Sequence, residues 1–194
     1  YEHVNPELVG NNRKILVSNQ AGKSNLLSRL KSIGMEIDRD DKRINTLLEI
    51  VKEREYMGYS YDGAGASFEI LAKNVLDQVP SFFSVENYEV TITGSKDESS
   101  LSKANISLNV DERIINSTGE GNGPVNALDN ALRKDLGIYN QYIQDLTLVD
   151  YKVRILDGGT EAITRVVIES SDSKNQSWFT VGISPNIIEA SFEA

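Results

Sequence analysis

The stretch Gly119-Glu-Gly-Asn-Gly-Pro-Val-Asn-Ala-Leu128 decides how this chain is expected to fold. Its closely spaced glycines predict a tight turn. Pro124 then suits the first position of a helix, because the amide hydrogen that proline lacks would have no helical partner there. The helix is predicted to run to about Lys134, so this stretch marks a turn that feeds directly into a helix.

Upstream of the turn, apolar residues alternate with polar ones, which is the period of half-buried strands. The alternating positions are Tyr88, Val90 and Ile92 in one segment and Ile106, Leu108 and Val110 in the next. A third strand is predicted near Arg113 to Thr118. The whole segment is therefore predicted to be a β-β-β-α unit.

A second unit of the same kind follows. Strands are predicted near 146–156, 162–170 and 177–183, and a last helix is predicted to begin at Asn186, after a Ser184-Pro185 junction.

Matching strings at a near-constant offset indicate an internal duplication. Tyr88-Glu-Val matches Tyr151-Lys-Val 63 positions later (151 minus 88), and Pro124 matches Pro185 61 positions later (185 minus 124). Two such units can pair about a pseudo-two-fold axis. The alternative is a chance likeness between two ordinary α+β segments.

Residues 1 to about 78 are predicted to form a linker with helices. Apolar residues recur at helical spacing in three groups, which are Leu26, Leu27 and Leu30; Ile44, Leu47, Leu48 and Val51; and Phe68, Ile70, Leu71 and Val75 within a pattern that starts at Gly58. Val79-Pro80 breaks the last helix, because the residue before proline disfavours the helical region. The expected fold class is therefore α+β, with helical linker subdomains at 1–78 and the duplicated β-β-β-α domain at 81–194.

Composition narrows the classes of partner. The chain has 29 acidic and 20 basic residues and a net charge of -9, which argues against nucleic acid and anionic membranes as partners. It has no cysteine, no apolar run of membrane-spanning length and no signal-peptide character at Tyr1-Glu-His-Val-Asn-Pro6. A soluble, cytoplasmic protein is expected. The missing initial Met suggests a piece of a longer polypeptide.

Two apparent catalytic signals are weak. The string Lys14-Ile-Leu-Val-Ser-Asn-Gln-Ala-Gly-Lys-Ser24 imitates a phosphate-binding loop, but Val17 stands where that loop needs glycine. His3 is the only histidine, so neither a metal site nor a catalytic triad is expected. Several carboxylates are predicted to lie on exposed helix faces and to serve solvation, namely Glu36, Asp38, Asp40, Asp41, Glu49 and Glu53.

The glycine turns are the candidate binding elements. Glycines ahead of a helix let the backbone come close to a ligand, and the amides of the first helical turn attract an anion such as a carboxylate. The second unit offers Gly182-Ile-Ser-Pro-Asn186, and Asp157-Gly-Gly-Thr160 lies between the two. The alternative is that these are plain tight turns with helix caps.

Long strings of the chain resemble one family. They are Tyr1-Glu-His-Val-Asn-Pro-Glu-Leu-Val-Gly-Asn11, Leu16-Val-Ser-Asn-Gln-Ala-Gly-Lys-Ser-Asn25, Gly58-Tyr-Ser-Tyr-Asp-Gly-Ala-Gly-Ala-Ser-Phe-Glu69, the Gly121-Asn-Gly-Pro124 loop and Thr180-Val-Gly-Ile-Ser-Pro-Asn-Ile-Ile-Glu-Ala-Ser191. They resemble the part of citramalate, isopropylmalate and homocitrate synthases that follows the catalytic barrel. The resemblance implies a parent enzyme that condenses acetyl-CoA with a 2-oxo acid, on a barrel that uses a divalent metal and is absent here.

The resemblance also implies a regulatory role for residues 81–194. In that family this domain dimerises and binds isoleucine or leucine as a feedback inhibitor at the dimer interface. Isoleucine is favoured, because the first segment looks closer to the citramalate branch. Carried onto this sequence, the effector-binding residues are Gly121, Gly123, Val125, Asn126, Leu148, Tyr151, Ile155, Ala162, Pro185 and Ile187. No cofactor is expected in these residues, and the helical linker is expected to move when effector binds.

Two other readings stay open. The chain could be a stand-alone small-molecule-binding or interaction domain with no enzyme attached. It could also be an enzyme acting through His3 and nearby carboxylates. Within the family reading, His3 has a smaller, accessory part, in which residues near Tyr1 and His3 reach the active site of a neighbouring subunit.

Overall fold

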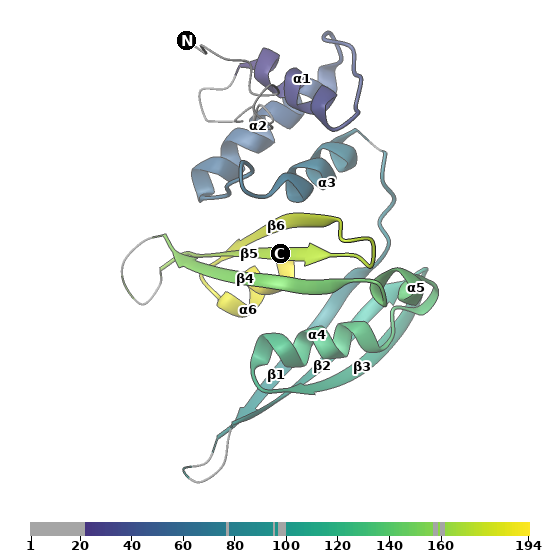
Figure 1. Ribbon diagram of the computed structural model, residues 1–194, viewed down its shortest axis with the longest axis vertical. Coiled ribbons are helices and arrows are strands. Elements are labelled where there is room, and N and C mark those ends of the chain that lie inside the picture. The colour runs from purple at the N-terminus through teal and green to yellow at the C-terminus, as the bar shows by residue number, and fades with distance from the viewer. Residues whose placement is uncertain (1–21, 77, 95, 97–99, 157–158, 160–161) are drawn as a thin grey trace. The chain divides into compact units, whose positions relative to one another are not determined.

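The computed structural model describes residues 22–76, 78–94, 96, 100–156, 159 and 162–194 (Figure 1). The chain divides into two compact units, Tyr1–Gln78 and Val79–Ala194. We call them the helical unit and the sheet unit and describe each by itself. Among the described helices, none combines the length and apolar character that crossing a membrane requires.

Three helices make up the described part of the helical unit: α1 (Lys23–Ser32), α2 (Lys42–Met57) and α3 (Gly65–Val75). Helical spacing correctly predicted the side chains that they bury, which are Leu26, Leu30, Ile44, Leu47, Val51, Phe68 and Leu71. The prediction for Ile70 was wrong, since its side chain is 51% exposed. The predicted helix from Gly58 was also wrong, because Gly58 ends α2 with φ 109° and α3 begins only at Gly65.

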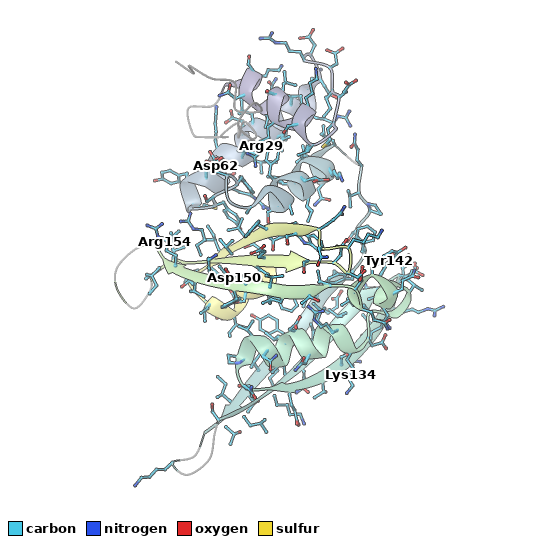
Figure 2. All side chains as sticks on the ribbon, viewed as in Figure 1. Arg29, Asp62, Lys134, Tyr142, Asp150 and Arg154 are labelled. Atoms are coloured by element: carbon cyan, nitrogen blue, oxygen red, sulfur yellow. The ribbon has the colours of Figure 1, made fainter. Side chains whose placement is uncertain are left out.

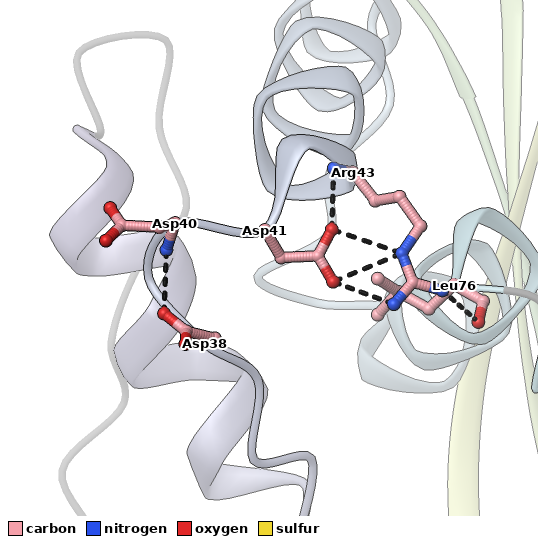
Figure 3. A network of polar contacts seen from close by, with 5 residues as sticks. All are labelled: Asp38, Asp40, Asp41, Arg43 and Leu76. Atoms are coloured by element: carbon pink, nitrogen blue, oxygen red, sulfur yellow. Dashed lines mark hydrogen bonds and ion pairs between the residues drawn. The ribbon is translucent and has the colours of Figure 1, made fainter.

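A polar network joins the start of α2 to the end of α3 (Figure 3). Asp41 caps α2 by accepting a hydrogen bond from the Arg43 amide at 2.9 Å, and the Arg43 guanidinium binds the same carboxylate. Arg43 also donates to the carbonyl of Leu76 at 3.1 Å. These hydrogen bonds hold the pKa of Asp41 below its ordinary value. Asp41 is therefore a capping residue, and not one of the solvating carboxylates on an exposed helix face.

The sheet unit contains two three-stranded antiparallel sheets. The first has β1 (Ser84–Thr93), β2 (Leu101–Val110) and β3 (Arg113–Gly121), followed by α4 (Pro124–Lys134). A connector with η2 (Gly137–Tyr139) and α5 (Asn140–Ile143) leads to β4 (Thr147–Ile155), β5 (Thr164–Ser171) and β6 (Ser177–Ser184), and α6 (Ile187–Glu193) ends the chain. This arrangement confirms the predicted α+β fold with a duplicated β-β-β-α unit. We call Ser84–Lys134 the first repeat and Thr147–Glu193 the second repeat.

Strand register shows how closely the repeats correspond. The first strand of each repeat carries an irregularity at the same place, between Val85 and Asn87 in β1 and between Leu148 and Asp150 in β4. Both positions differ by 63 residues (148 minus 85 and 150 minus 87). Tyr88 pairs with Ile106, and its counterpart Tyr151 pairs with Ile168. The duplication therefore preserves the pairing of the strands as well as their order.

A glycine sets the distance between sheet and helix in both repeats. A Cβ added at Gly119 would lie 2.4 Å from the Ala127 carbonyl oxygen, and one at Gly182 would lie 2.0 Å from the Ala190 carbonyl oxygen. Both pairs are again 63 positions apart (182 minus 119 and 190 minus 127). Each helix can rest on its third strand only because that strand has no side chain at the contact.

The prediction that Pro124 and Pro185 are equivalent positions, 61 residues apart, was wrong. The first helical residue after Gly123 is Pro124, whereas the first after Asn186 is Ile187. Ile187 lies 63 positions after Pro124, the offset of the rest of the scaffold. Pro185 therefore precedes the helix cap of the second repeat and does not start its helix.

The helices lie between the two sheets and join the repeats into one core. The first sheet and α4 bury a cluster of Ala104, Ile106, Leu108, Val110, Ala127, Leu128, Ala131 and Leu136. Ile188 and Phe192 of α6 pack against this cluster, and the Phe192 ring stacks on Tyr88 at 5.7 Å. In Figure 1, α4 crosses the face of the first sheet while α6 lies against the second. The helix of the second repeat thus completes the core of the first.

Candidate functional site

A cavity of about 230 Å³ lies where the two repeats meet. Its wall comes from one face of α4, from the start of β4, from β5 and from the end of α6. The lining residues are Val125, Leu128, Asp129, Leu132, Arg133, Leu146, Leu148, Ile168, Ser170, Ser191, Phe192, Glu193 and Ala194. The cavity is somewhat smaller than the roughly 300–1,000 Å³ of pockets for drug-sized molecules, so it suits a small metabolite.

The wall is mainly apolar, with a few polar groups at defined places. Arg133 donates from Nε to Asp129 Oδ1 at 2.8 Å, one helical turn away on α4. Ser191 Oγ donates to the Ile187 carbonyl and shares a hydrogen bond of 2.6 Å with the Tyr151 hydroxyl. A wall of this kind can enclose an aliphatic group while it offers both signs of charge to a polar head.

Two of the residues carried over from the family line this cavity, Val125 on α4 and Leu148 on β4. Tyr151 lies next to it, because its hydroxyl contacts the lining residue Ser191. Strand pairing supports this placement: Leu148 pairs with Ser170 and Tyr151 pairs with Ile168, and both partners line the cavity. Val125, Leu148 and Tyr151 therefore lie around one cavity.

Gly121, Gly123 and Asn126 gather where β3 turns into α4. The Asn126 side chain accepts a hydrogen bond from the Asn122 amide at 3.3 Å, and a Cβ at Gly121 would lie 2.4 Å from Asn126 Oδ1. Gly123 is the N-cap of α4 and provides no side-chain cap. α4 begins at Pro124, one residue before the lining residue Val125, so this loop adjoins the cavity at that end.

The remaining carried-over residues lie at the other end of the second sheet. Ile155 pairs with Thr164, which pairs in turn with Ser184 beside Pro185. Ala162 precedes β5 and Ile187 begins α6. Ile155 is 66% exposed and Ile187 is 42% exposed. Ile155, Pro185 and Ile187 are exposed and Ala162 is half-buried, and none of these residues lines the described cavity.

Several lining residues were missed in the sequence. Leu128, Asp129, Leu132 and Arg133 share a face of α4 with Val125, at spacings of three, four, seven and eight. The apolar period of this face was visible, but it is the period of any amphipathic helix. Ile168 and Ser170 are two apart on β5 and gave only a strand signal. Sequence alone could not show that these two elements face each other.

Some predictions fall on residues outside the described part of the chain. They concern His3 with its neighbour Tyr1, most of the string Lys14–Ser24, and Asp157, Gly158 and Thr160 of the third glycine turn. Among the residues that the structure describes, no group of three His, Cys, Asp or Glu side chains could hold a metal ion.

The most strongly perturbed carboxyl group of the described residues lies in the helical unit. Burial and, to a smaller extent, the neighbouring Asp62 carboxylate raise the pKa of Glu55 to about 7, while Arg29 opposes the shift. Arg29 lies 3.9 Å from Asp62 and donates to the Tyr61 carbonyl at 2.8 Å (Figure 2). These contacts hold α1 against the loop after α2, so we assign the cluster a structural role within the helical unit.

The chain is similar in sequence to several known synthases. The chain is 46% identical over 197 residues to the (R)-citramalate synthase of Aquifex aeolicus and 45% identical over 197 residues to that of Geobacter sulfurreducens. It is 27% identical over 197 residues to the 2-isopropylmalate synthase of Methanocaldococcus jannaschii. Each alignment covers all of this chain, but only 37%, 37% and 36% of these relatives.

The family model of the LeuA allosteric (dimerisation) domain matches residues 62–194, which include the whole sheet unit. That stretch contains both repeats and the cavity between them. The chain belongs to the LeuA allosteric (dimerisation) domain family.

Proposed function

We propose that residues 81–194 are the feedback sensor of a synthase that condenses acetyl-CoA with a 2-oxo acid, and that they bind a branched-chain amino acid. Residues 1–78 would be the linker subdomains. Catalysis, and the divalent metal that serves it, would belong to a barrel domain of the whole protein. Isoleucine is the preferred effector, because the relatives with 45% and 46% identity are named citramalate synthases.

The cavity between the repeats carries this proposal. Val125, Leu148 and Ile168 offer an apolar wall, and burial of a branched side chain there is worth roughly 2 kcal/mol or more. The start of α4 lies beside it and has no side-chain cap, so its first-turn amides suit the carboxylate of an amino acid. One methylene changes affinity by only about 1–3 kcal/mol, so the shape of the wall would choose between isoleucine and leucine.

A second copy of the chain is the proposed partner, in keeping with the name of the family. The first strands of both repeats carry exposed apolar side chains, and Ile92, Val153 and Ile155 are 43% to 66% exposed. Ile92 and Ile155 are equivalent positions, 63 residues apart. A symmetric dimer could cover the exposed Ile92 and Ile155, because each subunit would contribute the same surface to the interface. Leu148 of the cavity and Ile155 lie at opposite ends of β4, so the effector in this cavity would bind away from the surface that Ile155 contributes.

Calorimetric titration with isoleucine, leucine and valine tests the proposal. One amino acid is expected to bind at least tenfold more tightly than the others. Leu148→Ala should weaken that binding about tenfold, because it removes part of the apolar wall. Val149→Ala is the matched control, since Val149 is the neighbouring exposed residue and lies outside the cavity lining. A dimeric sample that binds none of the three amino acids would contradict the proposed function.

A further inference from the structure

The connector between the repeats forms part of two hollows in the sheet unit. Leu146 lines the cavity described above. Ile143 lines a second, larger hollow of about 470 Å³, which we call the aromatic groove. Its lining residues are Phe82, Phe83, Leu136, Tyr139, Tyr142 and Ile143. One short segment of chain therefore borders both the cavity and the groove.

Arg133 holds this segment to α4. Its Nη1 donates to the Leu146 carbonyl at 2.6 Å and more weakly to the Ile143 carbonyl at 3.5 Å. Its Nε donates to Asp129, so a single guanidinium spans the cavity wall and the connector. The planar fork of arginine allows this, because its donors point in fixed and different directions. A lysine at this position could not reproduce both sets of bonds.

The rest of the connector is held largely by local hydrogen bonds. Asn140 Oδ1 accepts from the Leu136 amide at 2.5 Å, and Asp135 Oδ1 accepts from the Gly137 amide at 2.8 Å. Asp145 reaches farther and accepts from the Ser173 amide at 3.0 Å. Local bonds keep the connector wound, whereas Arg133 and Asp145 determine where it sits on the domain.

The aromatic groove reaches the chain segment that enters the sheet unit. The Phe82 ring meets the Tyr139 ring edge to face at 5.4 Å. Tyr142, which also lines the groove, is 69% exposed (Figure 2). Phe82 and Phe83 follow Val79-Pro80 at the beginning of this unit. Phe82 therefore links the connector by direct ring contact to the first residues of the sheet unit.

We propose that Arg133 is a positioning residue that couples occupancy of the cavity to the aromatic groove, and through Phe82 and Phe83 to the segment joining the two units. The inference rests on the proposed function, because an amino acid in the cavity is what would act on Arg133, Asp129 and Leu146. Because Arg133 lines the cavity, a ligand there can contact the guanidinium, and coupling requires those contacts to differ between two positions of the connector. The aromatic groove is the part of the domain that would change when the cavity is occupied.

Hydrogen exchange read by mass spectrometry tests the coupling on the whole chain. In the absence of ligand, Arg133→Lys should raise amide exchange severalfold in residues 137–146 and 80–84. Asp129→Asn frees only one end of the guanidinium and should give a smaller rise in the same segments. Lys134→Ala is the matched control, because Lys134 is the adjacent residue but donates to the Thr118 carbonyl of β3 at 3.2 Å. Circular dichroism before exchange selects folded samples.

The same exchange measurement with ligand bound tests this inference separately from the proposed function. With isoleucine or leucine bound, the wild type should be protected in both segments, whereas Arg133→Lys should still bind but no longer protect 80–84. Equal exchange of Arg133→Lys and wild type without ligand, or equal protection of 80–84 with it, would overturn the coupling. Absence of binding to the wild type would instead count against the proposed function, while the ligand-free comparison still decides the role of Arg133.

Discussion

The two repeats of the sheet unit differ in what their inner faces bury. On β2 of the first repeat the inner side chains Ala104, Ile106, Leu108 and Val110 are all sealed under the helices. Strand pairing makes Val166, Ile168 and Ser170 of the second repeat equivalent to Ala104, Ile106 and Leu108. Of these three, only Val166 is a fully buried apolar residue, and Ser170 puts a hydroxyl group where the first repeat has Leu108. The cavity opens on this second face.

This difference suggests how a duplicated scaffold divides its tasks. The glycine contact and the strand irregularity are the same in both repeats, because they set the geometry of sheet and helix. The inner face is free to diverge once that geometry is fixed. A tightly packed first repeat supplies stability, whereas a less filled second repeat leaves room for a ligand. The following predictions test this division, from the largest expected effect to the smallest.

Alanine at either contact glycine should be severely destabilising in both repeats. The added Cβ of Gly119→Ala or Gly182→Ala would overlap backbone atoms of the covering helix at 2.4 Å or less, so the helix must move away. We expect each change to lower the free energy of unfolding by about 3 kcal/mol or more, measured by urea denaturation.

Gly123→Ala provides the control for the glycine variants. A Cβ at Gly123 would meet no atom within 4 Å, and its backbone is extended at φ -161°. A loss below about 0.5 kcal/mol is expected there. If only one of the two contact glycines proved sensitive, the shared scaffold would be refuted.

Truncation of the equivalent isoleucines Ile106 and Ile168 should lower the free energy of unfolding by different amounts in the two repeats. Ile106 is 2% exposed in the sealed core, so Ile106→Ala should cost about 3 kcal/mol. Ile168 is only partly buried and borders the cavity, so Ile168→Ala should cost about 1.5 kcal/mol. Equal losses in denaturant unfolding would mean that the second face is packed as well as the first.

The helix starts should differ in their dependence on asparagine. Asn186 caps α6 by accepting from the Ile188 amide at 2.9 Å, so Asn186→Ala should cost about 1 kcal/mol. Asn126→Ala loses only a 3.3 Å hydrogen bond in the exposed loop before α4, and should cost a few tenths of a kcal/mol. Thermal unfolding can compare the two variants. A cost for Asn126→Ala as large as that for Asn186→Ala would show that α4 also depends on a cap.

The free energy of unfolding should depend on pH through Glu55, a residue of the helical unit that has no equivalent in either repeat. The folded state raises the pKa of Glu55 from its ordinary 4.5 to about 7, so it binds a proton more tightly than the unfolded chain does. The free energy of unfolding therefore falls as pH rises from about 4.5 through about 7. Glu55→Gln should remove this fall and gain roughly 1 kcal/mol at pH 8, after allowance for solvent screening. An unchanged pH profile of the variant would refute the assignment.

Removal of the hydroxyl groups of the equivalent residues Tyr88 and Tyr151 should give the smallest difference in stability between the two repeats. Tyr151 shares a 2.6 Å hydrogen bond with Ser191, so Tyr151→Phe should cost roughly 0.5–1 kcal/mol. Tyr88 contributes its stacked ring, which Tyr88→Phe retains, so a change within about 0.3 kcal/mol is expected. A larger loss for Tyr88→Phe in thermal unfolding would reverse this comparison.

Much of the scaffold could be predicted because its signals are local. The alternation in β1 and β2 and the proline at the start of α4 appear in adjacent residues and act through nearby hydrogen bonds. The register between the repeats was harder to predict. Pro185 resembles Pro124, but only the paired strands and the helix caps revealed that Ile187 is its equivalent.

The sequence by itself determined the order of the strands and helices, the duplication and the family. Only the tertiary structure decided which face of each element encloses space. Val125 and Ile168 are 43 positions apart (168 minus 125), and they line one cavity because α4 packs between sheets of different repeats. Local periodicity governs whether a helix or strand forms, whereas a cavity depends on how imperfectly two distant surfaces fill the volume between them.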